Sequence, residues 1–194
     1  MNEIDEPELI DAVRTGTIAD GTRDGVLRAV PAAMLRRFCH DLKDQVDPRG
    51  LRLRSAVIVG CLDLAGLTVP FPLRFDGCEF DSVPIVEGAD LFELSLTNCP
   101  RLPGLLGNGL RVRRDLDLSG SRVAGAHWTS ASTSHPSAIW LCEAEIGGRL
   151  LCVDTNVDGL GYRSIHADRF HVGGAARLIH GFKASGEVRF SAPP

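Results

Sequence analysis

Aromatic residues are scarce in this sequence: they make up 6% of its 194 residues, whereas hydrophobic residues as a whole make up 44%. A core with so few large rings depends on leucine, valine, isoleucine and alanine, and such a core is narrow. The sequence also lacks any apolar run that approaches about 18 residues, the length that a membrane-spanning helix needs. We therefore expect one elongated domain without a transmembrane segment.

The first residues, MNEIDEPEL, are acidic. They have neither the basic region nor the apolar region of a secretory signal peptide. On this ground we predict a cytoplasmic location.

Sequence motifs of enzymes are missing as well. There is no G-x-G-x-x-G after a strand pattern, no P-loop, no G-x-S-x-G and no H-E-x-x-H. We expect a protein that is not an enzyme and that binds no cofactor.

The six cysteines show no C-x-x-C and no metal-ligand spacing. We interpret them as reduced thiols that pack as small hydrophobic side chains. The densest histidines, His166, His171 and His180, together with Asp168, leave a metal site as an alternative. Spacings of five and nine residues do not bring three ligands to one level of a regular repeat, so we expect no metal.

Residues 56–120 repeat with a period of eleven residues. Within each unit the third, seventh and ninth positions are mostly apolar, and a polar or charged residue separates the last two. This alternation is typical of a very short strand with one buried face. The eleventh position holds glycine or asparagine, which tolerate the left-handed backbone of a tight corner. These corner residues are Gly66, Gly77, Gly88, Asn98, Gly109 and Gly120.

Strands this short cannot bury a face alone, so successive units are expected to stack and to pair their backbones. The sequence thus predicts an all-β solenoid, a β-helix with coils of about 22 residues that each contain two units. Cys78 and Cys99 share the first position of units two apart, so this arrangement stacks them on adjacent coils and makes them the one pair that could bridge on oxidation. A leucine-rich repeat is the alternative fold, because its spacing LxxLxLxxCxxL is matched by Leu91, Leu94, Leu96, Cys99, Leu102 and Leu105.

Residues 1–49 lack the eleven-residue pattern, and we predict that they form an N-terminal helical cap. Pro7 suits a first helical turn and Gly16 a helix end, while Pro31 begins a second, amphipathic helix that Pro48 ends. Such helices would cover the open end of the first coil. We therefore divide the chain into a cap, residues 1–49, and a repeat domain, residues 50–194.

A segment rich in serine, threonine and proline interrupts the repeat and is predicted to be a loop at about residues 127–137. It carries His127, Trp128 and His135, and Trp140 follows it. Aromatic and imidazole side chains on a protruding loop are typical of partner recognition. These four residues are our candidate partner-binding site; the alternative is that a tryptophan folds back onto the repeat.

The last alternating strand covers residues 187–190, and no helix is predicted after it. An uncovered end suggests a homodimer through the C-terminal end; a protein cut short and shielding by the final prolines are the alternatives. From residue 50 onward the chain has 15 acidic and 14 basic residues. Because this region is nearly neutral, we expect no nucleic-acid partner.

The segments SAVIV, GCLDL and AGLTV at residues 55–69, each with an apolar residue in the middle, resemble pentapeptide-repeat proteins. This resemblance implies a right-handed, four-sided β-helix, and some members of that family inhibit or protect DNA gyrase, usually as end-to-end dimers. LDLSGSRV and AEIGGRLL look like the repeats of long uncharacterised actinobacterial proteins, some of them catalogued as membrane-associated oxidoreductases. The resemblance covers about residues 50–190.

We expect a non-enzymatic binding or scaffold protein that contacts another macromolecule, a protein of unknown identity, through the faces of the predicted β-helix and through the loop. The resemblance leaves two alternatives. One is an oxidoreductase of unknown substrate, and the other is a gyrase-interacting protein.

The predicted register can be tested by two substitutions at neighbouring positions. Leu118→Ala should lower the free energy of unfolding by about 2 to 5 kcal/mol, because it removes an inward side chain and leaves a cavity. Asp117→Asn should change it by no more than about 0.5 kcal/mol, as is usual at the surface. Urea unfolding of both variants measures this, and equal losses would contradict the register.

Overall fold

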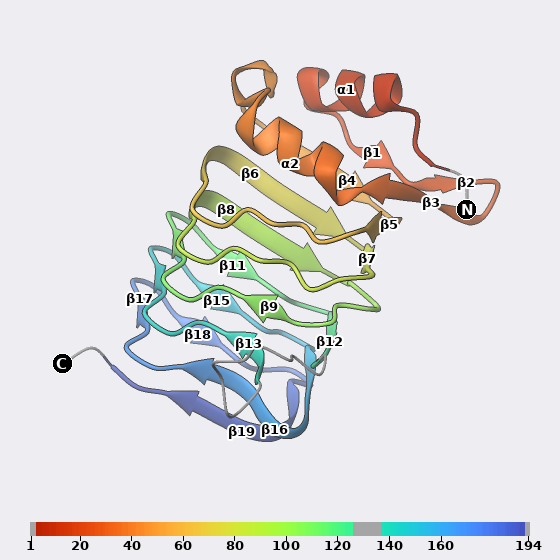
Figure 1. The fold of residues 1–194 in the computed structure, drawn as a ribbon. Coiled ribbons are helices and arrows are strands. Elements are labelled where there is room, and N and C mark those ends of the chain that lie inside the picture. The colour runs from red at the N-terminus through yellow and green to blue at the C-terminus, as the bar shows by residue number, and fades with distance from the viewer. Residues whose placement is uncertain (1–2, 126–136, 193–194) are drawn as a thin grey trace.

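The computed structural model describes residues 3–125 and 137–192. Figure 1 shows a stack of short strands with two helices, α1 and α2, together at the end that holds the N-terminus, while β16 and β19 lie at the opposite end. The layers of the stack follow one another in chain order.

The N-terminal part contains both helices and strands. Its elements are α1 (Glu6–Thr15), β1 (Ala19–Asp20), β2 (Thr22–Arg23), β3 (Val26–Pro31), α2 (Ala32–His40) and a short 3-10 helix (Lys43–Gln45).

After the 3-10 helix, the elements of the described residues are all strands. They are β4 (Leu51–Arg54), β5 (Ala56–Val59), β6 (Thr68–Asp76), β7 (Glu79–Phe80), β8 (Asp90–Thr97), β9 (Leu105–Leu106), β10 (Arg111–Val112), β11 (Leu116–Asp117), β12 (Arg122–Ala124), β13 (Ser137–Trp140), β14 (Glu145–Ile146), β15 (Leu150–Leu151), β16 (Asn156–Ala167), β17 (His171–Val172), β18 (Ala176–Arg177) and β19 (Lys183–Phe190).

The strands form three sheets. The largest has ten strands and contains the path β1-β4-β6-β8-β10-β14-β17, to which β11, β15 and β18 are attached. A second sheet joins β12, β16, β13 and β9, with β19 on β16, and the third has the order β2-β3-β5-β7. Among the described residues the strand pairs are parallel, except for β2 with β3, which is antiparallel.

The predicted alternation and corners within the repeat are confirmed. Leu62, Leu64, Leu116 and Leu118 are at most 2% exposed. The glycines and the asparagine at the eleventh position all have positive φ, between 52° for Asn98 and 72° for Gly120. These corners turn the chain, and the apolar positions of successive units belong to one hydrophobic core.

The predicted surface position of Asp117 needs correction. Asp117 is half-buried rather than exposed, and so is Asp63, the polar residue between Leu62 and Leu64. The Asp117 carboxylate accepts a hydrogen bond from the Ser119 backbone N–H at 2.9 Å. An asparagine side chain keeps an oxygen acceptor for this bond, which is compatible with a small effect of Asp117→Asn.

The first helix begins and ends where the sequence predicts. Pro7 lies in its first turn, and Gly16 ends it with φ of 63° while its N–H bonds to the carbonyl of Ala12. The second helix begins directly after Pro31, as predicted, but it ends at His40 and not near Pro48. Leu35, Phe38 and Cys39, on the buried face of α2, and Leu9, on that of α1, belong to the same core as the strands.

The predicted fold class is wrong. The chain is not an all-β solenoid or a right-handed β-helix of uniform coils; it has an α/β-like arrangement of three separate, mostly parallel sheets with two helices on the same core. The separation between paired residues is 22 for Leu51 with Leu73 but 34 for Leu116 with Leu150 and 26 for Leu150 with Ala176. The eleven-residue period reports local alternation and corners, and it carries no information on how strands group into sheets.

The alternative of a leucine-rich repeat is wrong for a related reason. Its pattern implies one strand per repeat in one sheet, whereas β8, which holds Leu91, Leu94 and Leu96, and β9, which begins at Leu105, belong to different sheets. Residues 1–49 also contain three strands that the sequence analysis missed, and β1 and β3 pair with β4 and β5. The division of the chain at residue 49 stays a prediction.

A column of buried donors links successive layers of the stack. Cys78, Cys99, Ser121 and Thr155 are all 0% exposed. Their side chains donate to backbone carbonyls of earlier strands: to Leu53 (3.7 Å), Phe75 (3.8 Å), Leu96 (2.7 Å) and Leu118 (3.0 Å), respectively. These bonds satisfy carbonyls that would otherwise be buried without a second partner.

The predicted pair Cys78 and Cys99 belongs to this column, and both thiols are free. Burial raises the pKa of each thiol to about 12. Because the thiolate is the reactive form, these two cysteines act as structural donors and not as nucleophiles at neutral pH.

Among the described helices, none is long and apolar enough to cross a membrane.

The donor column predicts a specific loss of stability. The Ser121 hydroxyl donates to the Leu96 carbonyl at 2.7 Å and accepts from the Cys99 N–H at 2.9 Å. Ser121→Ala should therefore lower the free energy of unfolding by about 1 to 3 kcal/mol, because two buried backbone groups lose a partner. Ser95→Ala, at a half-buried serine of β8, is the control, and similar losses in urea unfolding would contradict the role of the column.

Candidate binding surface at the C-terminal edge

The stack ends in strands with an open side, which we call the C-terminal edge: β17, β18 and β19. In the described part of the chain β17 pairs only with β14, β18 only with β15 and β19 only with β16. Each of these strands therefore leaves the backbone groups of its other side without a strand partner among these residues. An unpaired strand side of this kind is a template for another strand.

Alternate residues of β19 direct their backbone groups to opposite sides. The N–H of Lys183 donates to the Thr155 carbonyl at 2.9 Å, and the N–H of Ser191 to the Ala167 carbonyl at 3.1 Å, both on the β16 side. Odd-numbered residues of β19 thus bond to β16. The N–H and C=O groups of its even-numbered residues, Val188 among them, face the open side.

The side chains at this edge form an incomplete apolar layer. Val188 lies beside Ile165 in the parallel register, and Phe190 beside Ala167. Ile165 and Ala167 are at most 1% exposed, whereas Val188 is 38% and Phe190 is 41% exposed. The difference arises because another strand covers β16 but none of the described strands covers β19.

Three further apolar side chains in the C-terminal part of the chain, Leu160, Tyr162 and Ile179, are also exposed. Leu160 and Tyr162 lie where β16 bends and its register with β19 shifts, and a shallow pocket of about 360 Å³ there is lined by Gly161, Tyr162, Arg163, Gly186 and Glu187. Exposed apolar side chains beside open strand sides are typical of a protein-binding surface.

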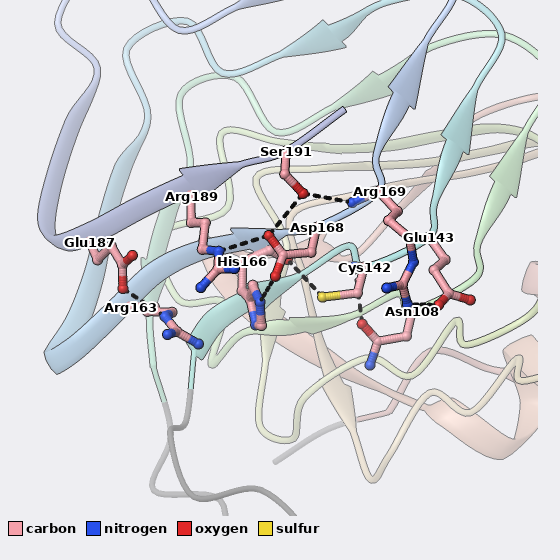
Figure 2. A network of polar contacts seen from close by, with 10 residues as sticks. All are labelled: Asn108, Cys142, Glu143, Arg163, His166, Asp168, Arg169, Glu187, Arg189 and Ser191. Atoms are coloured by element: carbon pink, nitrogen blue, oxygen red, sulfur yellow. Dashed lines mark hydrogen bonds and ion pairs between the residues drawn. The ribbon is translucent and has the colours of Figure 1, made fainter. Parts of the chain in front are cut away.

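A polar network fixes the outer side of β19 against β16 (Figure 2). Arg163 Nε donates to Glu187 Oε2 at 2.7 Å, and Arg189 Nε to Asp168 Oδ1 at 2.8 Å. Asp168 also accepts from the Ser191 hydroxyl at 3.1 Å. The edge strand is therefore held by side chains as well as by its backbone.

Asp168 is the centre of this network. Its second oxygen, Oδ2, lies 3.0 Å from Nε2 of His166. The hydrogen bond to His166 is the main cause that lowers the pKa of Asp168 to about 2, and the hydrogen bonds to Ser191 and Arg189 lower it further. A carboxylate with so low a pKa and with its oxygens already hydrogen-bonded is a weak base. The arrangement is suited to positioning β19 and not to proton transfer.

Of the four candidate partner-binding residues predicted from the sequence, the structure describes only Trp140. His127, Trp128 and His135 lie outside the described residues. Trp140, on β13, is half-buried; its ring nitrogen donates to the Ser137 carbonyl at 3.1 Å, and its ring meets that of His166 edge to face at 5.1 Å. A role of the four residues in partner binding stays a prediction.

The histidines of the alternative metal site are dispersed. His166 contacts Asp168, His171 is on β17 beside Glu145 of β14, and His180 is at a corner with φ of 49°. Within residues 3–125 and 137–192, no three His, Cys, Asp or Glu residues gather in a way that could hold a metal ion. Nδ1 of His166 is buried without a hydrogen-bond partner in this part of the chain.

The sequence analysis located the last strand but missed Leu160, Tyr162 and the network around Asp168. The network connects residues more than 20 positions apart, such as Asp168 with Arg189. Contacts of this kind depend on the pairing register of β16 and β19, and no local sequence signal reveals that register.

Comparisons of the chain with protein-family models, with curated proteins and with solved structures found no match. The resemblance to pentapeptide-repeat proteins thus stays an expectation from the sequence. The geometry of the C-terminal edge is the basis for the function proposed below.

The low pKa of Asp168 predicts how stability depends on pH. A carboxylate whose pKa is lowered by folding stabilises the folded state above its unfolded pKa, about 3.9, and loses this effect as the pH falls through about 2. The wild type should thus be more stable than Asp168→Asn at pH 7, and the difference should shrink between about pH 4 and pH 2. Asp24→Asn, at an exposed turn residue, is the control for urea unfolding at each pH; a difference that does not change with pH would contradict the prediction.

Proposed function

We propose that this protein is a non-enzymatic binding or scaffold protein and that it contacts another protein chain through the C-terminal edge. The observation that carries the proposal is the combination of open strand sides with half-exposed apolar side chains, Val188 and Phe190 above all. A protein chain can supply both the backbone groups and the apolar contacts that such an edge lacks.

The sides of the stack support the same proposal. Arginines pair with carboxylates of a neighbouring layer, as Arg74 of β6 with Glu93 of β8 at 2.6 Å, and Arg149, just before β15, with Asp115, just before β11, at 2.6 Å. Side chains occupied in this way leave little unbalanced charge to attract a nucleic acid. Within the described residues, the faces thereby offer a rigid support, and the edge is a surface with unmet backbone and apolar contacts.

A homodimer through the C-terminal end is one specific form of this proposal. The alternatives from the resemblance, an oxidoreductase and a gyrase-interacting protein, stay predictions, and no feature of the described residues favours either of them. A cytoplasmic location likewise stays a prediction.

The two lysines of the chain allow a direct test. Lys183 lies on β19 at the C-terminal edge, and Lys43 lies in the short 3-10 helix near the other end. With an amine-reactive cross-linker applied in a lysate, protein partners should be attached through Lys183 and rarely through Lys43, as measured by mass spectrometry of the cross-linked peptides.

The matched variant is Val188→Asp with Phe190→Asp, which places charges in the apolar layer. It should remove the cross-links of Lys183 without changing those of Lys43, because a charged edge is costly to bury. Cross-links that form equally through both lysines, or that persist in this variant, would contradict binding at the C-terminal edge.

A further inference from the structure

We propose that a small pocket on the outer face of the largest sheet binds inorganic phosphate as the hydrogen phosphate dianion. The pocket lies on β4, β6 and β8, which are neighbouring strands of that sheet (Figure 1). This inference goes beyond the proposed function, because the pocket belongs to another part of the stack than the C-terminal edge.

Two rows of polar side chains line the pocket. Each strand alternates inward apolar residues with outward polar ones: LRLR in β4, LRFD in β6 and LSLT in β8. The parallel registers of these strands set the outward residues side by side. One row contains Arg52, Arg74 and Ser95, and the other contains Arg54, Asp76 and Thr97. Three guanidinium groups therefore accompany one carboxylate, and the lining has an excess of positive charge.

The first row holds two like charges next to each other. Arg52 and Arg74 are direct neighbours across β4 and β6. Adjacent strands are about 4.8 Å apart, and two positive charges on one face at such a spacing repel each other. Among the described residues Arg52 contacts no carboxylate, and its hydrogen bond there is to the Gly16 carbonyl at 3.4 Å. An anion bound between the two arginines offsets this repulsion.

The lining residues keep donors for such an anion. Arg74 binds Glu93 through Nε at 2.6 Å, and its two terminal nitrogens have no hydrogen-bond partner in the described part of the chain. The Ser95 hydroxyl lines the pocket as well and donates to none of the described residues. Guanidinium groups bind phosphate oxygens through paired N–H groups, and these charge-assisted bonds are stronger than neutral ones.

The size of the pocket limits its ligand. The volume is about 130 Å³, which corresponds to roughly four water molecules at about 30 Å³ each. A tetrahedral anion with four oxygens needs about this space, whereas drug-sized ligands occupy pockets of about 300 Å³ or more. Ile18, which is 38% exposed, adds an apolar wall. The pocket is therefore suited to a single phosphate group.

Asp76 favours hydrogen phosphate over sulfate. Its Oδ1 accepts hydrogen bonds from the Asn98 side chain at 2.8 Å and from the Thr97 hydroxyl at 3.3 Å. Its Oδ2 lies 3.4 Å from Nε of Arg54 and keeps capacity to accept from a further donor. Hydrogen phosphate has an O–H group that can donate to this oxygen, whereas sulfate has no proton at neutral pH. A carboxylate among three guanidinium groups thus matches an anion that both accepts and donates.

NMR of the arginine side chains tests the location of the site. When the full chain is titrated with sodium phosphate at constant ionic strength, the Nε–H signals of Arg52, Arg54 and Arg74 should shift and saturate together. The signal of Arg177, on β18 of the same sheet, should not shift. Equal shifts at all arginines, or shifts that never saturate, would mean an adventitious ion only and would overturn the inference.

Two matched variants test the role of Arg52. Arg52→Gln should weaken phosphate binding about tenfold or more, because it removes a charge-assisted contact. Arg177→Gln is the control and should leave the affinity unchanged. Arg177 continues the row of Arg52 through the registers of the later strands, and it also lacks a carboxylate partner among the described residues. Circular dichroism without phosphate checks that both variants are folded, and equal losses of affinity in the two would contradict the pocket.

The choice of anion tests the role of Asp76. The wild type should bind phosphate more tightly than sulfate, and Asp76→Asn should reduce this preference, because an amide can donate to either anion while its oxygen still accepts from Asn98 and Thr97. Methyl phosphate above its second pKa, about 6, has no O–H group and should bind more weakly than free phosphate. Sulfate or methyl phosphate that binds the wild type as tightly as phosphate would overturn hydrogen phosphate as the ligand.

Discussion

Parallel pairing between strands of successive layers is the constraint on which the rest of this structure depends. Most strands have only two to four residues, too few to bury a face or to satisfy their backbone groups without a neighbour. Each strand is therefore stable only when it is paired with strands of the neighbouring layers. The buried donors at Cys78, Cys99, Ser121 and Thr155 strengthen this dependence, because each one bonds a carbonyl of an earlier strand.

The same constraint makes the two ends of the stack different from its middle. At the N-terminal end α1 and α2 pack on the core with Leu9, Leu35 and Phe38 buried. At the other end the side chains of β19 that continue the inner rows are half-exposed, although their neighbours on β16 are buried. This asymmetry is the basis of the binding function proposed for the C-terminal edge.

The network around Asp168 links stability to this surface. It holds β19 on β16 through Arg189, Ser191 and His166, and it also presents Glu187 and Arg189 along the outer side of the edge strand. A strand fixed in this way loses less conformational freedom when it is bound than a mobile segment would lose. The contacts that stabilise the last layer would thereby favour the binding proposed for this edge.

The sequence by itself determined the local features: the buried leucines at 62, 64, 116 and 118, the left-handed corners such as Asn98, and the start and end of α1. These depend on alternation and on residues that tolerate positive φ, which are local properties. Only the tertiary structure decided that the strands form three sheets with helices on the same core, and that Asp168 meets Arg189. Those contacts join residues more than 20 positions apart, and their choice depends on pairing register and on packing, which a repeat pattern leaves open.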